Sequence, residues 1–274
     1  MSDLSLAHAD VRIPPQPAVL ARLFELLAAG ECDIRRVAQV IAGDAGLAAL
    51  LFRLAASPIY AKGRRADSLE RVLQVVGVQQ SFNLARALAL EGAIGGDRRV
   101  LEVFWQRSGD IARIAAEVAS DRVAVCNVFP DQAYLAAIFQ DCGVPLLAER
   151  FPDYGSLKTL AVGAACWASM VEEDRRYSTD HCVVGYLVAR HWKLPDFVAD
   201  AIRCHHELVG LGEHRVRSLV AILMLAQEIY CREHGIHNAE WFGAADLVMS
   251  ELGLDPAGLD EYCDEIRDRC HAAG

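Results

Sequence analysis

The chain has 274 residues, of which 53% are hydrophobic and 23% charged, and its formal net charge is −10. That length can bury a substantial core, and the composition is that of a globular protein rather than a disordered or fibrous one. The acidic balance, with only short basic runs such as "KGRR", argues against a protein that binds nucleic acid through its phosphates.

The apolar segments and the cysteines give no sign of a membrane or secreted protein. The longest apolar runs, "LAALLF" and "LVAILMLA", are far shorter than the roughly 20 residues that cross a bilayer. The first residues, "MSDLSLAHADVRIPP", show no features of a secretory signal. The nine cysteines are scattered and form no CxxC pair, which favours reduced thiols over disulfides or a cysteine zinc site. We therefore expect a cytoplasmic protein.

Two helices are predicted early in the chain by their apolar spacing. One apolar stripe runs over residues 34–41 and a second over residues 47–54. Gly43 and Gly46 predict a turn between the two helices. Asp44 is expected to cap the second helix, because its short polar side chain can accept a hydrogen bond from a free backbone N–H.

The remainder of the chain is also helical in pattern. Asp67 and Glu70 predict a helix start ahead of an apolar stripe over residues 69–76, and similar stripes recur to the C-terminus. The segment "RVAVCNVF" is the one short strand candidate, and it fits a loop or a helix equally well. The sequence thus predicts an all-α protein.

A glycine-rich, charged seam at residues 91–99, "EGAIGGDRR", separates two helical blocks. We expect an N-terminal helical subdomain before it and a larger helical part from about residue 97 onward. Residues 1–12 are expected to form a poorly ordered tail.

One apolar run, "YLAAIFQDCGVPLL" at residues 134–147, contains a carboxylate, Asp141. Burying a carboxylate alone costs several kcal/mol, so Asp141 needs a metal ion, a cation of the protein or a helix end. In "FVADAIRCHHE", the spacing over residues 198–202 puts His205 on the buried face of a helix, with His206 about 100° further round. Inward-facing histidines and carboxylates build metal sites in helical bundles, and a packed, hydrogen-bonded pair is the alternative.

Six separated segments, in the expected order, resemble the HDOD family. They are "IPPQPAVLARLFELL", "VAQVIAGDAGLAALLFRLAASPIYAKG", "DSLERVLQVVGVQQSFNLARALAL", "VFWQRSGDIARIAAEVA", "AYLAAIFQDCGVPLL" and "STDHCVVGYLVARHWKLPDFVADAIRCHHE". The resemblance implies an HDOD domain over residues 13–207, made of an N-terminal helical subdomain (13–92) and an HD-like helical bundle (97–207). Residues 208–274 would be a helical extension of the HD-like part.

The resemblance also implies where the ligands of the related HD superfamily of metal-dependent phosphohydrolases would fall. The first histidine ligand falls at Arg107, a permanent cation that cannot bind a metal. The His-Asp pair falls at Gln140 and Asp141, so only the aspartate is kept, and the last aspartate falls nearest Gln227. The "GYP" signature of the two-metal HD-GYP branch is missing. Further histidines of that branch correspond here to His181, His205 and His206.

This degenerate ligand set predicts a pocket without catalytic residues. Hydrolysis in the superfamily needs a divalent ion to activate water, and a guanidinium repels such an ion. An ion pair between Arg107 and Asp141 would satisfy both charges without a metal. We expect no cofactor. If a divalent transition metal such as iron or manganese does bind, its ligands would be Asp141, His181, His205 and His206.

By resemblance, the chain is expected to be a non-catalytic bacterial signalling or regulatory module that binds a protein partner or a small ligand. Its expected partners are other signalling proteins of two-component or cyclic-dinucleotide pathways. One alternative is a divergent metal-dependent phosphohydrolase similar to the HD-GYP phosphodiesterases. The other is a nucleotide-binding sensor without turnover that uses Arg107 as an anion clamp. The oligomeric state is left open.

Overall fold

The computed structural model describes residues 11–29, 33–56, 66–95, 98–154 and 169–272. Within these ranges every regular element is a helix and no strand occurs, which confirms the all-α prediction. The strand candidate "RVAVCNVF" is wrong, because its first five residues end a long helix. Most of the predicted tail (1–10), part of the predicted seam (96–97) and the basic run "KGRR" lie outside the described residues.

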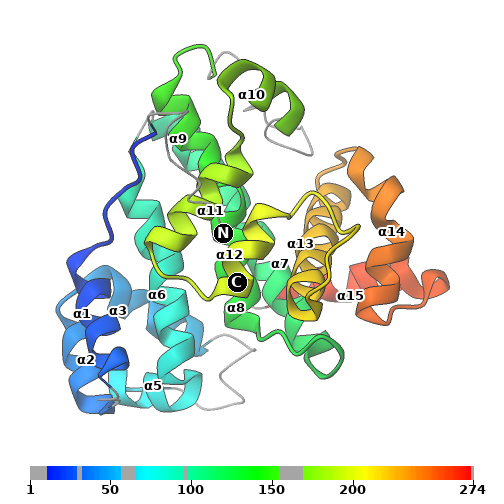
Figure 1. Ribbon diagram of the computed structural model, residues 1–274. Helices are drawn as coiled ribbons and strands as arrows, with labels where there is room; N and C mark the ends of the chain where they lie inside the picture. The colour runs from blue at the N-terminus through cyan, green and yellow to red at the C-terminus, as the bar shows by residue number, and fades with distance from the viewer. Residues whose placement is uncertain (1–10, 30–32, 57–65, 96–97, 155–168, 273–274) are drawn as a thin grey trace.

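Two groups of helices follow one another along the chain (Figure 1). The N-terminal block contains α1 (Ala18–Ala28), α2 (Ile34–Ala42), α3 (Ala45–Ala56), α5 (Leu69–Val76) and α6 (Val78–Ala93). The second block contains α7 (Arg98–Cys126), α8 (Pro130–Gln140), α9 (Gly143–Arg150), α10 (Met170–Tyr177), α11 (His181–His191), α12 (Asp196–Arg203), α13 (His214–Glu233), α14 (Ala239–Leu252), the 3-10 helix η2 (Pro256–Gly258) and α15 (Leu259–Ala272). Across the described ranges, no helix combines the length and apolarity that crossing a membrane requires.

Side-chain caps explain several of the helix starts. Asp44 Oδ1 accepts a hydrogen bond from the Leu47 backbone at 2.9 Å, which confirms Asp44 as a cap. The cap of α5 is Ser68 rather than the predicted Asp67, since Ser68 Oγ accepts from the Arg71 backbone at 3.2 Å. Gly77, with φ of +97°, lets α5 end and α6 begin at one residue.

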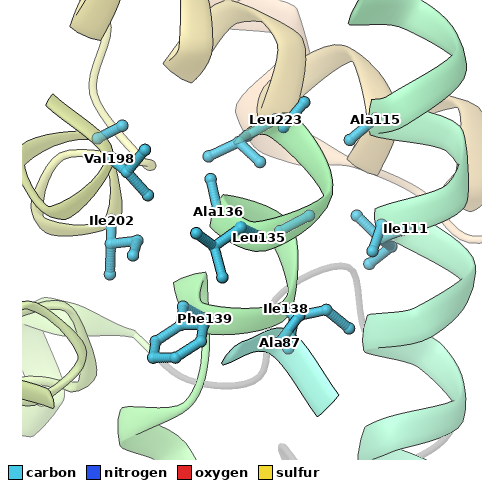
Figure 2. Close-up of a cluster of buried hydrophobic side chains, with 14 of the residues drawn as sticks. Ala87, Ile111, Ala115, Leu135, Ala136, Ile138, Phe139, Val198, Ile202 and Leu223 are labelled. Atoms are coloured by element: carbon cyan, nitrogen blue, oxygen red, sulfur yellow. The ribbon is translucent and has the colours of Figure 1, made fainter. Parts of the chain in front are cut away.

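The core of the second block is built around α8. Figure 2 shows Leu135, Ala136, Ile138 and Phe139 of α8 among side chains of the surrounding helices. Those surrounding side chains are Ala87 of α6, Ile111 and Ala115 of α7, Val198 and Ile202 of α12, and Leu223 of α13. All of these side chains are buried, so the hydrophobic effect holds α8 at the centre of the second block. Both ends of α8 therefore pack against neighbouring helices.

The two blocks are also joined by polar contacts. Asn83 Nδ2 on α6 donates to Asp131 Oδ2 on α8 at 2.7 Å, and both side chains are buried. Arg86 Nη2 donates to the Lys193 carbonyl at 2.7 Å, and the fully buried Trp192 donates through Nε1 to the Pro14 carbonyl at 2.9 Å. These bonds fix the orientation of the N-terminal block because each would leave a buried polar group unpaired if the blocks moved apart.

Candidate functional site

The buried carboxylate that the sequence singled out lies at the C-terminal end of α8. Asp141 is 8% exposed and is the C-cap residue of the helix. A carboxylate at this end faces the negative pole of the helix dipole, so the helix end does not stabilise it and a positive partner is required.

Close backbone packing brings this helix end to the start of α11. A Cβ on Gly143, two residues after Asp141, would lie 2.2 Å from the His181 carbonyl oxygen, so only glycine allows this approach. Asp180 accepts a hydrogen bond from the Val183 backbone at 2.7 Å and caps α11, which makes His181 the first helical residue. His181 is consequently buried beside Asp141.

The two remaining histidines approach from the end of α12. The prediction that His205 is buried is confirmed, with 7% of its surface exposed. The prediction that it lies on the helix is wrong: α12 ends at Arg203, and His205 and His206 occupy the turn that follows. Because α11 and α12 pack together, this turn lies against the start of α11.

The three imidazoles converge with Asp141 on one point. Asp141 Oδ1 lies 3.7 Å from His181 Nε2 and 3.6 Å from His205 Nε2. The Nε2 atoms of His181 and His206 are 3.0 Å apart. The structure therefore brings together four of the predicted site residues, Asp141, His181, His205 and His206.

The other ring nitrogen of each histidine contacts a hydrogen-bond acceptor. His181 Nδ1 lies 2.6 Å from Glu173 Oε2, and His206 Nδ1 lies 2.9 Å from Glu240 Oε2. His205 Nδ1 lies 2.8 Å from the Ile202 carbonyl. Since each Nδ1 faces an acceptor, it is the nitrogen that keeps the proton when a ring is neutral, and Nε2 then carries the lone pair.

Charge at the site is balanced between the carboxylate and the imidazoles. Burial raises the pKa of Asp141, but the nearby imidazole of His205 and the charges of His181 and His206 outweigh it and hold that pKa well below its usual range. Burial lowers the pKa of His181, whereas contacts with Cys182 and Glu173 raise it to about 10. The pKa of His205 is likewise raised well above its ordinary value, against burial, by Cys182 and Asp141.

The cations beside Asp141 are therefore imidazoles, where the sequence predicted a guanidinium. Arg107 is buried on α7, and its guanidinium carbon lies 5.3 Å from the centroid of the Tyr230 ring on α13. An arginine over an aromatic face makes a favourable cation–π contact.

At the positions that the resemblance matches to HD ligands, Gln140 supplies an amide in place of a histidine, and Gln227 supplies one in place of an aspartate. Gln140 Nε2 donates to Asp141 Oδ2 at 3.4 Å, and Gln227 Nε2 donates to Cys231 Sγ at 3.6 Å. The donor set of an HD hydrolase does not fit this pocket, because Asp141 is the one carboxylate among the positions matched to Arg107, Gln140, Asp141 and Gln227.

A small cavity opens beside these groups. Its volume is about 30 Å³, which leaves room for no more than a few water molecules. Its wall includes Asp141 and the two histidines that follow α12, and Glu240 and Trp241 of α14 close the opposite side. The cavity thus links the histidine cluster to the C-terminal helices.

Sequence reasoning missed three side chains of this site: Glu173, Cys182 and Glu240. Glu173 is 1% exposed and accepts a hydrogen bond from Tyr154, although it lies in the charged run "VEEDRR", which reads as solvent-exposed. Cys182 Sγ lies 3.4 Å from His181 Nε2, and its proximity to a histidine in "DHC" was the available signal. Burial raises the pKa of Cys182, but His205 and the other imidazoles lower it to about 4.

The sequence model of the HDOD domain matches residues 13–208. The chain belongs to the HDOD family. An HDOD domain protein of unknown function from Geobacter sulfurreducens is 23% identical with a TM-score of 0.65, over 94% of this chain and 92% of that one. A Shewanella amazonensis protein, provisionally named a metal-dependent phosphohydrolase, is 19% identical with a TM-score of 0.73, over 96% and 91%. These two likenesses show the shared helical fold.

Two further relatives are longer than this chain. A Marinobacter aquaeolei protein, provisionally named a signal transduction protein, is 25% identical with a TM-score of 0.66, over 95% of this chain and 58% of that one. An uncharacterized protein of Treponema pallidum is 19% identical over 207 residues, which are 74% of this chain and 39% of that protein. This chain thus spans well under two thirds of either relative.

Proposed function

We propose that this HDOD protein is a non-catalytic regulatory module that acts by binding other signalling proteins. The size of the cavity at the histidine cluster carries the proposal. Pockets that bind substrates of nucleotide size have volumes of several hundred Å³, whereas this cavity holds about 30 Å³. A phosphodiester has no room in this cavity beside Asp141 and His205. The wider groove of about 720 Å³ reaches the cluster at His206 and is not lined by Asp141, His181 or His205.

The chemistry of the pocket supports the same conclusion. A hydrolytic metal centre needs protein ligands that hold the ion and leave a coordination position open for water. Here two of the positions matched to HD ligands carry amides and a third carries a buried guanidinium, which packs on Tyr230. The Marinobacter relative, with its provisional signalling name, is consistent with a regulatory role for the fold.

The contacts between the two blocks suggest how such a module would transmit a signal. A partner that binds the N-terminal block acts on α6, and the bonds from Asn83 and Arg86 extend from α6 to α8 and to the loop before α12. The first route ends on α8, which carries Asp141, and the second ends just before α12, which is followed by His205 and His206. Partner binding at the N-terminal block would therefore change the position of these site residues in the second block.

A hydrolysis assay tests the proposal against the phosphohydrolase alternative. Purified protein loaded with Mn²⁺ or Fe²⁺ is incubated with bis-p-nitrophenyl phosphate and with a cyclic dinucleotide. We expect no more turnover than for the Asp141→Asn variant. Turnover by the wild type that is lost in Asp141→Asn would overturn the proposal.

Calorimetry tests the nucleotide-sensor alternative. Because Arg107 is only 5% exposed, a phosphate cannot reach its guanidinium without opening the core. We expect no heat of binding when nucleotides are titrated into the wild type. Saturable binding that is lost in Arg107→Ala would favour the sensor instead.

A further inference from the structure

We propose that His181, Cys182, His205 and His206 bind a single divalent transition-metal ion. One ligand atom from each of these side chains lies within 4.8 Å of the others. This ligand set differs from the one that the resemblance implied, Asp141 with the three histidines. The thiol of Cys182 takes the place of Asp141, and Asp141 stays beside the ion as a neighbouring anion. The inference goes beyond the proposed regulatory function and does not depend on it.

The distances between donor atoms suit one common ion. Nitrogen ligands about 2.0 Å from an ion lie roughly 2.9–3.4 Å from each other, and a nitrogen and a sulfur ligand roughly 3.1–3.6 Å apart. The Nε2 atoms of His181 and His206 are 3.0 Å apart, and Cys182 Sγ lies 3.4 Å from His181 Nε2. The remaining donor pairs are up to 4.8 Å apart, so these side chains would move closer together around a bound ion.

The surroundings hold the histidines in the ring orientation that a metal requires. Metal-bound histidines typically donate their second N–H to a carboxylate or a backbone carbonyl, which fixes the ring and its tautomer. Glu173, Glu240 and the Ile202 carbonyl provide these acceptors for His181, His206 and His205. Glu173 is itself held by Tyr154. The acceptors therefore form a complete outer layer around three imidazoles.

A buried nitrogen that makes no hydrogen bond, with Asp141 as a charged neighbour at 3.6 Å, points to a ligand. His205 Nε2 is buried and makes no hydrogen bond to any described residue, although its side chain is only 5% exposed. A buried polar atom left unpaired costs roughly 1–3 kcal/mol. A metal ion bound at this lone pair would satisfy it, and Asp141 Oδ1 at 3.6 Å would offset the positive charge of the ion.

The donor types select the class of ion. Imidazole and thiolate suit Zn²⁺, Co²⁺, Ni²⁺ or copper, whereas Mg²⁺ and Ca²⁺ require oxygen ligands. A groove of about 720 Å³, lined in part by Met170, Cys204 and His206, gives an ion a route from solvent to the exposed edge of the cluster. Four protein ligands close a tetrahedral site, which is the arrangement of structural rather than catalytic zinc.

Cobalt titration tests the site directly. Untagged, full-length protein is stripped with a chelator and titrated with Co²⁺, because visible d–d bands report tetrahedral coordination and a near-ultraviolet charge-transfer band reports a thiolate ligand. We expect one Co²⁺ per chain with both features, displaced by one equivalent of Zn²⁺ and unaffected by excess Mg²⁺. Absence of stoichiometric binding, or binding without the charge-transfer band, would overturn the proposed ligand set.

Variants separate this site from adventitious binding. Cys182→Ser should abolish the charge-transfer band, and His206→Ala should weaken Zn²⁺ binding by at least about 100-fold. Glu240→Gln, which alters an exposed outer carboxylate and should leave the fold intact, should weaken it by about tenfold or more. The matched control is His271→Ala, which removes an exposed histidine paired with Glu233 at 2.8 Å. Equal loss in the control and the site variants would contradict the proposal.

Discussion

The two ends of α8 each bury an aspartate, and the two carboxylates behave in opposite ways. Asp131, in the first turn, is 3% exposed and pairs with the neutral amide of Asn83. Burial raises its pKa, although the Asn83 hydrogen bond acts against this. Asp141, at the far end, has a lowered pKa because imidazoles surround it. Burial is similar at the two ends, so the partner decides the protonation of each carboxylate.

The two ends of α8 also have different structural roles. The Asp131 end joins α8 to the N-terminal block through a neutral partner and a favourable helix pole. The Asp141 end lies at the unfavourable pole and is compensated by charge. The buried contact between Asn83 and Asp131 holds the two blocks together. The buried carboxylate of Asp141 instead keeps a positive charge, whether a proton or a metal ion, beside the C-terminal end of α8.

The largest effect is expected at the Asp141 end. Asp141→Ala in chelator-treated protein removes the anion and leaves buried imidazoles without their charge partner. We expect the free energy of unfolding at neutral pH to fall by about 3–5 kcal/mol, as measured by urea denaturation. A loss below about 1 kcal/mol would show that the imidazoles do not depend on this carboxylate.

A smaller effect is expected at the Asp131 end. Asn83→Ala leaves a buried carboxylate without its amide donor, so we expect a loss of about 1–3 kcal/mol in the same measurement. Asn83→Asp should be worse than Asn83→Ala, because it places a second acidic group against Asp131. If both variants retain wild-type stability, the amide–carboxylate contact does not join the blocks.

The smallest effect is a pH dependence with a defined sign. Because the folded-state pKa of Asp131 is raised, its contribution to stability is present at pH below the unfolded value, near 3.9, and is lost as pH rises through the folded value. Stability of the wild type relative to Asp131→Asn should therefore decline between about pH 3 and pH 7. A relative stability that increases over this range would mean that the pKa of Asp131 is lowered.

Sequence patterns predicted the features that depend on local spacing. The all-α fold, the cap at Asp44 and the burial of Asp141 and His205 follow from helical periodicity and capping chemistry. The family resemblance brought His181 together with Asp141 and the His205–His206 pair. These features need no knowledge of which helices pack together.

The partners of each buried group could not be predicted in the same way. Arg107 was the expected cation for Asp141, but the close approach of Gly143 to His181 places imidazoles there instead. Glu173 and Cys182 join the site only because α10 packs on α11 and the start of α11 lies beside the end of α8. For Glu173, no local pattern distinguishes it from a surface residue. Such contacts depend on tertiary packing rather than on spacing along the chain.

A double-mutant cycle across Asp141 and His205 tests most directly whether imidazoles hold this carboxylate. Stability is measured for the wild type, Asp141→Asn, His205→Gln and the double variant, all in chelator-treated protein. We predict a coupling energy of roughly 1–3 kcal/mol between the two side chains. Additive effects with no coupling would contradict the account, because they would show that Asp141 draws its compensating charge from elsewhere.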